Sequence, residues 1–280
     1  DMDENSDRNK KLWGEYFSAY SPDMLVQDVK NADAFLNEMT QFEVGWAGFY
    51  RDNFRDRLRG ARILELGAGD GKNALLMVAL GAEKVTAIEI TNETERLIIS
   101  AADELGFTER IEVRIGDFAV MDFEERSFDF VVGKALLHHL THEVEDQYLQ
   151  KVAKLLRLDG EARFFEPAIN SQLLDQIRWI MPVRGRPSRL NKQAFAAWKA
   201  HDSHPERDNS TEHYRAVASR YFAQVEIKPI GGLERFHRIL PGGNIQRHYR
   251  EAALKAEHLL PMGIQSFIAR SQTIILHQPK

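Results

Sequence analysis

Residues 61–71 of the chain read ARILELGAGDG. The first six are mostly apolar, the last five include three glycines, and a helical pattern follows to about residue 80. A short apolar strand that runs through a glycine-rich turn into a helix is typical of the first unit of an open α/β sheet. Glycine allows the sharp turn and lets a ligand approach the backbone closely. The stretch therefore predicts a ligand site at the carboxyl end of the first strand.

The same alternation of strand and helix continues along the chain, which predicts a doubly wound, mostly parallel sheet. The expected strands are residues 61–66, 84–89, 111–115, 128–133, 161–166, 221–230 and 271–277. The expected helices between them include residues 92–105 and 143–156. We predict four regions: a helical N-terminal lid (1–57), an α/β core (58–169), an inserted cap after strand five (170–220), and C-terminal strands and a helix that complete the sheet (221–280).

Aromatic residues at helical spacing predict amphipathic helices within the N-terminal lid. The first set runs from Trp13 to Tyr20, and the second runs from Phe35 to Trp46. Between them, Ser21 and Pro22 have the residue types of an N-cap and a first helical position.

Composition excludes several classes of protein. The chain has 280 residues, of which 43% are hydrophobic and 28% charged, and this is ordinary for a globular protein. Cysteine is absent, so disulfides, thiolate metal sites and a cysteine nucleophile are excluded. We expect a reducing, cytoplasmic location. No apolar run is long enough for a membrane span, and the net charge of −5 gives no general attraction to nucleic acid.

Acidic residues stand at the ends of three of the expected strands. Glu89 ends the second strand, where a carboxylate can accept hydrogen bonds from both hydroxyls of a ribose. Asp117 and Phe118 follow the third strand, where an acid can bind an adenine amino group and an aromatic ring can cover the base. Glu65 lies two residues before the first glycine, and its charge would repel a dinucleotide pyrophosphate but suit a cationic ligand.

These motifs resemble those of the class I S-adenosylmethionine (SAM)-dependent methyltransferases. The matching parts of residues 61–166 are the run 65–71, Glu89, Gly116-Asp117, the strand 128–132 and the strand ending in Phe165-Glu166-Pro167. The resemblance implies a Rossmann-like, seven-stranded, mostly parallel sheet whose last strand is antiparallel. It implies that SAM is the cofactor and is bound by Glu65, Gly67, Ala68, Gly69, Glu89, Ile90, Asp117, Phe118 and Lys134.

Two further segments resemble small-molecule methyltransferases. Residues 13–20 resemble the N-terminal helix that closes over SAM, and this places Tyr16 and Tyr20 at the cofactor, although core packing explains them equally well. Residues 136–140 read LLHHL, and His138 and His139 are the candidate catalytic bases. Their alternative role is to shape the loop.

The cap contains the candidate acceptor-binding residues. Arg178, Trp179 and Arg184 belong to a segment rich in arginine, and guanidinium groups suit a carboxylate or phosphate. A solvated face is the alternative. Five other histidines are scattered: His201, His204, His213, His237 and His248. Among these, only His201 and His204 have the spacing of metal ligands, and no nearby set of Asp, Glu or His completes a site, so we predict no metal.

The resulting hypothesis is methyl transfer from SAM to an oxygen, nitrogen or carbon atom of a small-molecule acceptor, with S-adenosylhomocysteine as the second product. The alternatives are an RNA methyltransferase and a non-catalytic SAM-binding protein. A nicotinamide-dependent oxidoreductase fits less well, because Lys72 stands where the dinucleotide fingerprint has glycine or alanine. We expect a monomer or homodimer with no membrane or nucleic-acid partner.

Overall fold

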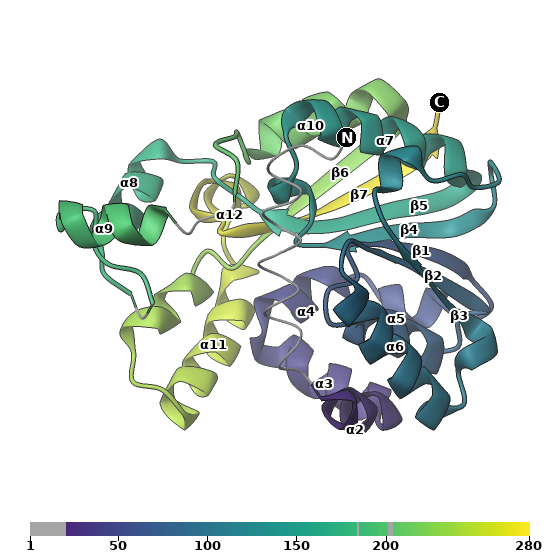
Figure 1. Cartoon of the computed structure of the whole chain (residues 1–280). Coiled ribbons are helices and arrows are strands. Elements are labelled where there is room, and N and C mark those ends of the chain that lie inside the picture. The colour runs from purple at the N-terminus through teal and green to yellow at the C-terminus, as the bar shows by residue number, and fades with distance from the viewer. Residues whose placement is uncertain (1–20, 184, 201–203) are drawn as a thin grey trace.

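The structure, a computed structural model, describes residues 21–183, 185–200 and 204–280. Its centre is one seven-stranded sheet in the order β3-β2-β1-β4-β5-β7-β6 (Figure 1). The strands are β1 (Arg62–Leu66), β2 (Lys84–Glu89), β3 (Ile111–Ile115), β4 (Phe128–Lys134), β5 (Leu156–Pro167), β6 (Phe222–Ile230) and β7 (Ser271–Pro279). β7 pairs antiparallel with both β5 and β6, whereas the pairs among β1 to β5 are parallel. The predicted fold class is confirmed.

Helices cover both faces of the sheet. The described α-helices are α2 (Pro22–Lys30), α3 (Ala32–Phe42), α4 (Val44–Phe49), α5 (Lys72–Ala79), α6 (Asn92–Leu105), α7 (His142–Leu155), α8 (Gln172–Ile180), α9 (Lys192–Lys199), α10 (Thr211–Tyr221), α11 (Asn244–Glu257) and α12 (Met262–Ile268). On one face α2, α4, α5 and α6 enclose the first apolar core, and on the other α7 and α10 enclose the second (Figure 1). No helix within the described ranges is long and apolar enough to cross a membrane.

Local signals start and stop these helices where the sequence predicts. Ser21 accepts a hydrogen bond from the backbone of Asp23 and Pro22 is the first residue of α2, as expected for an N-cap followed by proline. Gly106 ends α6 with φ of +71°, a left-handed conformation that glycine adopts without strain.

Several boundaries differ from the prediction. β5 has twelve residues, Leu156–Pro167, and begins before the expected start at residue 161. Leu156 pairs with Phe128 of β4 ahead of a register shift, and the regular pairing with β4 and β7 begins at Glu161. Trp46 belongs to the separate helix α4, because Glu43 is extended and ends α3.

The regions around the sheet also differ from the expected organisation. α10 lies within the predicted cap, but it packs on β6 and α7 as part of the core layer. One helix was expected within residues 221–280, whereas the structure has two α-helices there, α11 and α12, and α11 packs against α3 of the N-terminal region. α8 and α9 form an arm that projects at the left of Figure 1. The division into four regions stays a prediction.

Buried ionic contacts hold α4 against the sheet. The Arg163 side chain on β5 is 1% exposed, and its Nε donates to Glu161 at 2.7 Å. Its Nη1 donates to the backbone oxygens of Phe49 and Arg51 at 3.1 and 3.2 Å. This anchor fixes the helix that carries Trp46 and leads to Tyr50, both of which lie near the predicted cofactor residues.

Candidate active site

The glycine loop after β1 adopts the conformation that its sequence requires. Gly67 and Gly69 have φ of +68° and +59°, a region that side chains other than glycine rarely occupy. A Cβ atom at Gly67 would lie 2.9 Å from Cδ1 of Leu136, so the loop after β4 packs directly on this turn. Ala68 between the two glycines is buried. The close approach brings the ends of β1 and β4 together.

Glu65 at the end of β1 is a buried acid with a free oxygen. Its side chain accepts a hydrogen bond of 2.6 Å from Asn73, which in turn accepts one of 2.7 Å from the Tyr50 hydroxyl. The other oxygen, Oε2, is buried with no hydrogen-bond partner in the described part of the chain. Burial raises the pKa of Glu65 to about 8. The site is therefore suited to a cationic group that would replace the missing partner.

Lys134 at the end of β4 faces the same region. Its Nζ lies 3.7 Å from the ring centroid of Trp46, within the range of a cation–π contact. Burial lowers the pKa of Lys134, while the nearby carboxylates Asp70 and Glu65 oppose that shift. The resemblance assigns this residue to the cofactor, and in the structure its charged side chain lies near Glu65.

Glu89 at the end of β2 binds the glycine loop. Its Oε2 accepts from the backbone NH of Gly69 at 2.9 Å, and its Oε1 accepts from that of Ile90 at 2.7 Å. Burial raises the pKa of Glu89, and these two backbone hydrogen bonds oppose the rise. Each carboxylate oxygen keeps a second acceptor position. Glu89 can therefore hold the loop and still receive hydroxyl groups.

Asp117 and Phe118 occupy different environments. Oδ1 of Asp117 accepts from the backbone of Ala119 at 2.8 Å and from the Tyr148 hydroxyl at 3.1 Å. Phe118 is 1% exposed and packs edge-on against Tyr148 with ring centroids 5.0 Å apart. The Phe118 side chain is part of the second apolar core, and its assignment to an adenine ring stays a prediction.

The turn that carries His138 and His139 is built around Glu166, the buried residue near the end of β5. One oxygen of Glu166 accepts from the backbone NH groups of Leu136 and Leu137 at 3.0 and 2.8 Å. The other oxygen lies 2.8 Å from Nδ1 of His138. Glu166 is 0% exposed, so these contacts fix the turn and the orientation of the His138 ring.

A third imidazole, His204, completes this group. Its ring stacks at 4.4 Å from that of His139 and at 5.1 Å from that of His138. Neither Glu166 nor His204 is among the predicted site residues. Glu166 could have been found from its place at the end of a central strand, whereas nothing in the chain spacing connects His204 with the histidine pair.

Two of the three predicted acceptor residues, Arg178 and Trp179, lie in the described part of the chain. Trp179 packs against Phe195 and Trp198 and donates to Asp175 at 3.0 Å, so it joins α8 to α9. Arg178 lies over the Trp179 ring and pairs with Asp175 at 2.9 Å. Its Nε is buried and unpaired among the described residues. The predicted site residues Tyr16, Tyr20 and Arg184 lie outside the described residues.

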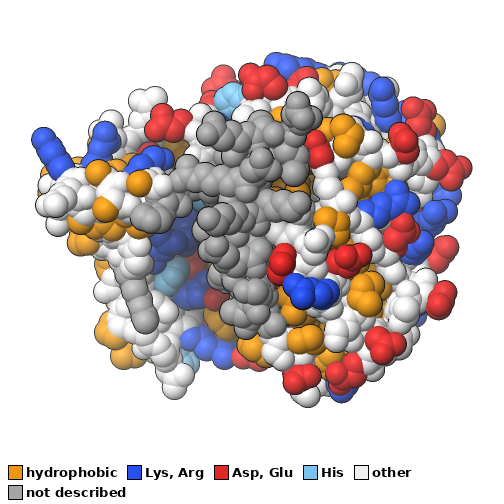
Figure 2. Space-filling view, in the orientation of Figure 1, with side chains coloured by type: hydrophobic (Ala, Val, Ile, Leu, Met, Phe, Trp, Pro, Cys, Tyr) orange, Lys and Arg blue, Asp and Glu red, His pale blue; other side chains and the backbone are white. Residues whose placement is uncertain are grey.

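An arginine cluster is defined by guanidinium groups whose charges act on one another, and Figure 2 shows basic side chains in the hollow below the α8–α9 arm. It comprises Arg178, Arg186, Arg235, Arg238 and Arg270. Burial, followed by the charges of neighbouring guanidinium groups, lowers the pKa of Arg270 to about 10. Arg270 lies 3.6 Å from Glu234, and that carboxylate also pairs with Arg250 at 2.7 Å. The cluster therefore holds more positive than negative charge.

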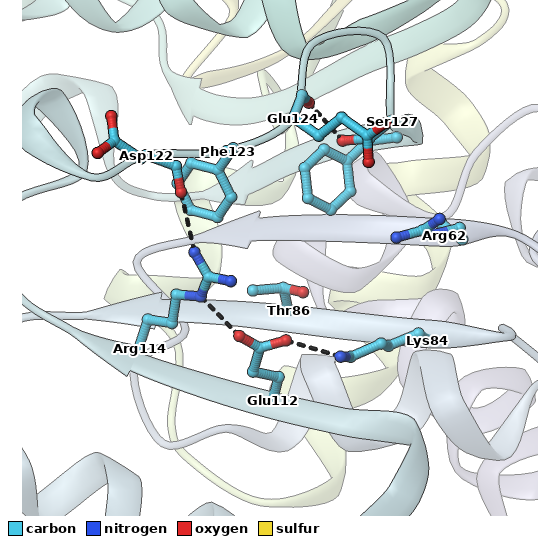
Figure 3. A pocket seen from close by; sticks show the side chains of 10 residues that line it. Arg62, Lys84, Thr86, Glu112, Arg114, Asp122, Phe123, Glu124 and Ser127 are labelled. Atoms are coloured by element: carbon cyan, nitrogen blue, oxygen red, sulfur yellow. Dashed lines mark hydrogen bonds and ion pairs between the residues drawn. The ribbon is translucent and has the colours of Figure 1, made fainter.

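A separate pocket of about 440 Å³ lies on the sheet around the first halves of β1 to β3 (Figure 3). It is lined by charged residues that pair with each other: Glu112 contacts Lys84 at 2.7 Å and Arg114 at 2.6 Å. Arg114 also donates to the backbone of Asp122 at 3.1 Å. None of the predicted site residues lines this pocket.

Comparison with known proteins identifies the class of domain that carries this site. Residues 63–160 match a family model described as a methyltransferase domain. The match covers 98 of the 280 residues, and the order and directions of the seven strands are consistent with a Rossmann-like methyltransferase fold.

Individual relatives match over limited lengths. An arsenite methyltransferase of Aquipseudomonas alcaligenes is 25% identical over 130 residues, which is 43% of this chain and 37% of the relative. A ribosomal protein L11 methyltransferase of Sorangium cellulosum is 35% identical over 82 residues, or 29% of this chain and 25% of the relative. The chain thus matches well under half of either curated relative.

One similar structure covers nearly the whole chain. It is a phosphoethanolamine N-methyltransferase of Haemonchus contortus, solved with phosphomonomethylethanolamine and S-adenosylhomocysteine. Its TM-score is 0.55 at 13% identity, and the match covers 94% of this chain and 61% of that one. At this identity the similarity shows a shared fold and no more.

Proposed function

We propose that this protein transfers a methyl group from SAM to a small-molecule acceptor and releases S-adenosylhomocysteine. The observation that carries the proposal is the free oxygen of buried Glu65 beside the glycine loop, within a methyltransferase domain. The ammonium group of SAM would pair with that oxygen. Gly67, Ala68 and Gly69 would line the methionine part.

The remaining cofactor contacts follow from the strand ends. The free acceptor positions of Glu89 would receive the two ribose hydroxyls, with the backbone of Ile90 alongside. Asp117 would bind the adenine amino group. The sulfonium is already activated, so the main contribution of the protein is to hold the methyl group and the acceptor atom in line.

The acceptor would lie toward the cap. We propose that it carries a carboxylate or phosphate, because the arginine cluster brings together several guanidinium groups, most of them partly buried, with few carboxylates to neutralise them. His138 and His139 would serve as bases toward the acceptor. They lie on the turn whose residue Leu136 packs on the glycine loop. Residues 170–220 would form the variable part of this acceptor side.

Isothermal titration calorimetry with SAM and S-adenosylhomocysteine tests the cofactor, with NADH and NADPH as controls. Micromolar binding of the first two alone supports the proposal, and no binding to folded protein refutes it. A panel of anionic acceptors is then screened by mass spectrometry for the gain of one methyl group. Salt-sensitive RNA binding in a gel shift, with no product from small molecules, would favour the RNA methyltransferase alternative.

A further inference from the structure

Three imidazole rings from two distant segments meet beside the proposed active site. His138 and His139 lie on the turn after β4, and His204 lies in the loop before α10. One ring nitrogen of each lies within 4.8 Å of the others. Neutral imidazole is the commonest protein ligand for zinc and for other first-row transition metals, so a group of three is a metal-binding arrangement.

The contact between His138 and Glu166 favours metal binding. Nδ1 of His138 lies 2.8 Å from Oε2 of the fully buried Glu166. A carboxylate on one ring nitrogen fixes the tautomer and leaves the other, Nε2, available as a ligand, as is usual for histidines bound to zinc. His138 is therefore oriented for coordination by a contact that does not involve the other two histidines.

Arg207 joins the turn after β4 to the loop before α10. Its Nη1 donates to the backbone oxygens of Leu137 and Leu140, at 2.7 Å each, and these residues flank the histidine pair. Its Nη2 donates to Glu145 at 2.7 Å, and the Arg207 side chain is 2% exposed. Because Arg207 is three residues from His204, this buried anchor keeps the third imidazole against the turn.

A second group of similar composition provides a contrast. His142, Glu145 and His213 also lie within ligand distance of one another. However, Oε2 of Glu145 already binds both Arg207 and His213 at 2.7 Å. The guanidinium charge at that oxygen opposes a cation. The second group is therefore a matched control for the first.

We propose that His138, His139 and His204 bind one divalent transition-metal ion, with Zn²⁺ as the preferred metal. The proposal deepens the proposed function, because it places a Lewis acid on the acceptor side. Bonds of 2.0–2.1 Å place the ligand atoms of a tetrahedral site roughly 3.3 Å apart. Separations of up to 4.8 Å would therefore shorten when the metal binds. Three neutral ligands preserve the full charge of the ion and leave a coordination position for an acceptor oxygen or water. This proposal replaces the expectation of no metal, which rested on chain spacing alone.

The test uses the full chain without an affinity tag, stripped with a chelator and dialysed. Titration with Zn²⁺ by calorimetry, and with Co²⁺ by visible absorption, is expected to show one equivalent bound with a dissociation constant in the micromolar range or below. His138→Ala and His204→Ala are expected to weaken binding at least a hundredfold. Glu166→Gln is expected to weaken it about 10–100-fold. His142→Ala and His213→Ala should leave it unchanged.

S-adenosylhomocysteine binding is measured on the same samples, so that loss of fold is recognised. Cofactor binding without stoichiometric metal would overturn the metal site and leave the methyltransferase proposal intact. Metal binding without cofactor binding would overturn the methyltransferase proposal and leave the metal site intact. Loss of the metal in His142→Ala or His213→Ala, with retention in His138→Ala, would also overturn the assignment.

Discussion

Asn73 donates a hydrogen bond of 2.6 Å to one oxygen of Glu65, while the other oxygen of this buried carboxyl group has no partner among the described residues. The pKa of Glu65 is raised to about 8 by burial. The free protein therefore keeps a group that is costly to ionise at the place where we expect the SAM ammonium group. The first two predictions follow from this.

Glu65→Gln should stabilise the free protein and weaken cofactor binding. Glutamine keeps the acceptor for Asn73 and removes the cost of a buried charge. Because the folded pKa of Glu65 lies above its unfolded value, its stabilising contribution is complete below about pH 4.5 and is lost as the pH rises through about 8. Urea unfolding at pH 8 should show a gain on the order of 2 kcal/mol, with little difference at pH 4.5. If Glu65→Gln changed the free energy of unfolding by the same amount at pH 8 and at pH 4.5, the raised pKa of Glu65 would be contradicted.

Cofactor affinity should depend on pH through the same group. The ammonium ion pairs with ionised Glu65, so binding requires loss of a proton that the free protein holds up to about pH 8. Between pH 6 and 7.5 the association constant for S-adenosylhomocysteine should rise toward tenfold per pH unit. Calorimetry in buffers of different ionisation enthalpy would detect the released proton. Glu65→Gln is the control, and its association constant should change much less with pH.

Glu89→Ala should weaken SAM binding while the protein stays folded. The substitution removes the charged acceptor for both ribose hydroxyls, and the loss should be on the order of a hundredfold. Calorimetry measures the affinity, and circular dichroism checks the fold. Glu112→Ala, in the pocket of Figure 3, is the matched control and should bind SAM normally. Unchanged affinity in Glu89→Ala would remove the ribose assignment.

The arginine cluster should recognise an anion before an acceptor is known. Inorganic phosphate is expected to raise the melting temperature of the native protein, and the Arg235→Gln, Arg238→Gln double variant should lose that response. Arg247→Gln is the control, because Arg247 is exposed and pairs with Glu38 and Glu251 on the surface. Once an acceptor is found, the double variant should raise KM about tenfold or more with little change in kcat. A phosphate response that survives in the double variant would exclude the cluster.

Gly71→Ala should destabilise the protein through a contact with α6. A Cβ atom there would lie 2.1 Å from Cγ1 of buried Ile98, so one of the two must move. The expected loss is about 1–3 kcal/mol in urea unfolding. Gly106→Ala shares the left-handed φ but meets nothing within 4 Å, so it isolates the backbone cost. Combining Gly71→Ala with Ile98→Ala should cost less than the sum of the single changes, and strict additivity would argue against the clash.

Local sequence was sufficient for the central sheet. The stretch at residues 61–71 has the apolar strand and glycines that the β1 turn requires, and Gly106 marks the end of α6. The outer helices were harder to predict. α11 contains many charged residues and buries only a few small or apolar ones against its neighbours, so its low apolar content makes it hard to recognise as part of the core.

The site was predictable only where its residues follow the strands. Glu65 and Glu89 end neighbouring strands, and parallel pairing brings such residues to one edge of the sheet. His204 reaches the histidine pair through the path of the cap, which Arg207 fixes by hydrogen bonds to backbone atoms. Such contacts leave no pattern in the sequence, because any residue type supplies a backbone oxygen.

The position of β7 affects how the chain can fold during its synthesis on the ribosome. β7 lies between β5 and β6, although it follows both along the chain, and within the described ranges β6 pairs with no other strand. The nascent chain can assemble β1 to β5 early, but β6 has no place until β7 has emerged. During this interval the open edge of β5 is exposed to chaperones and to other nascent chains. The glycine loop can thus form while the acceptor side is still being translated.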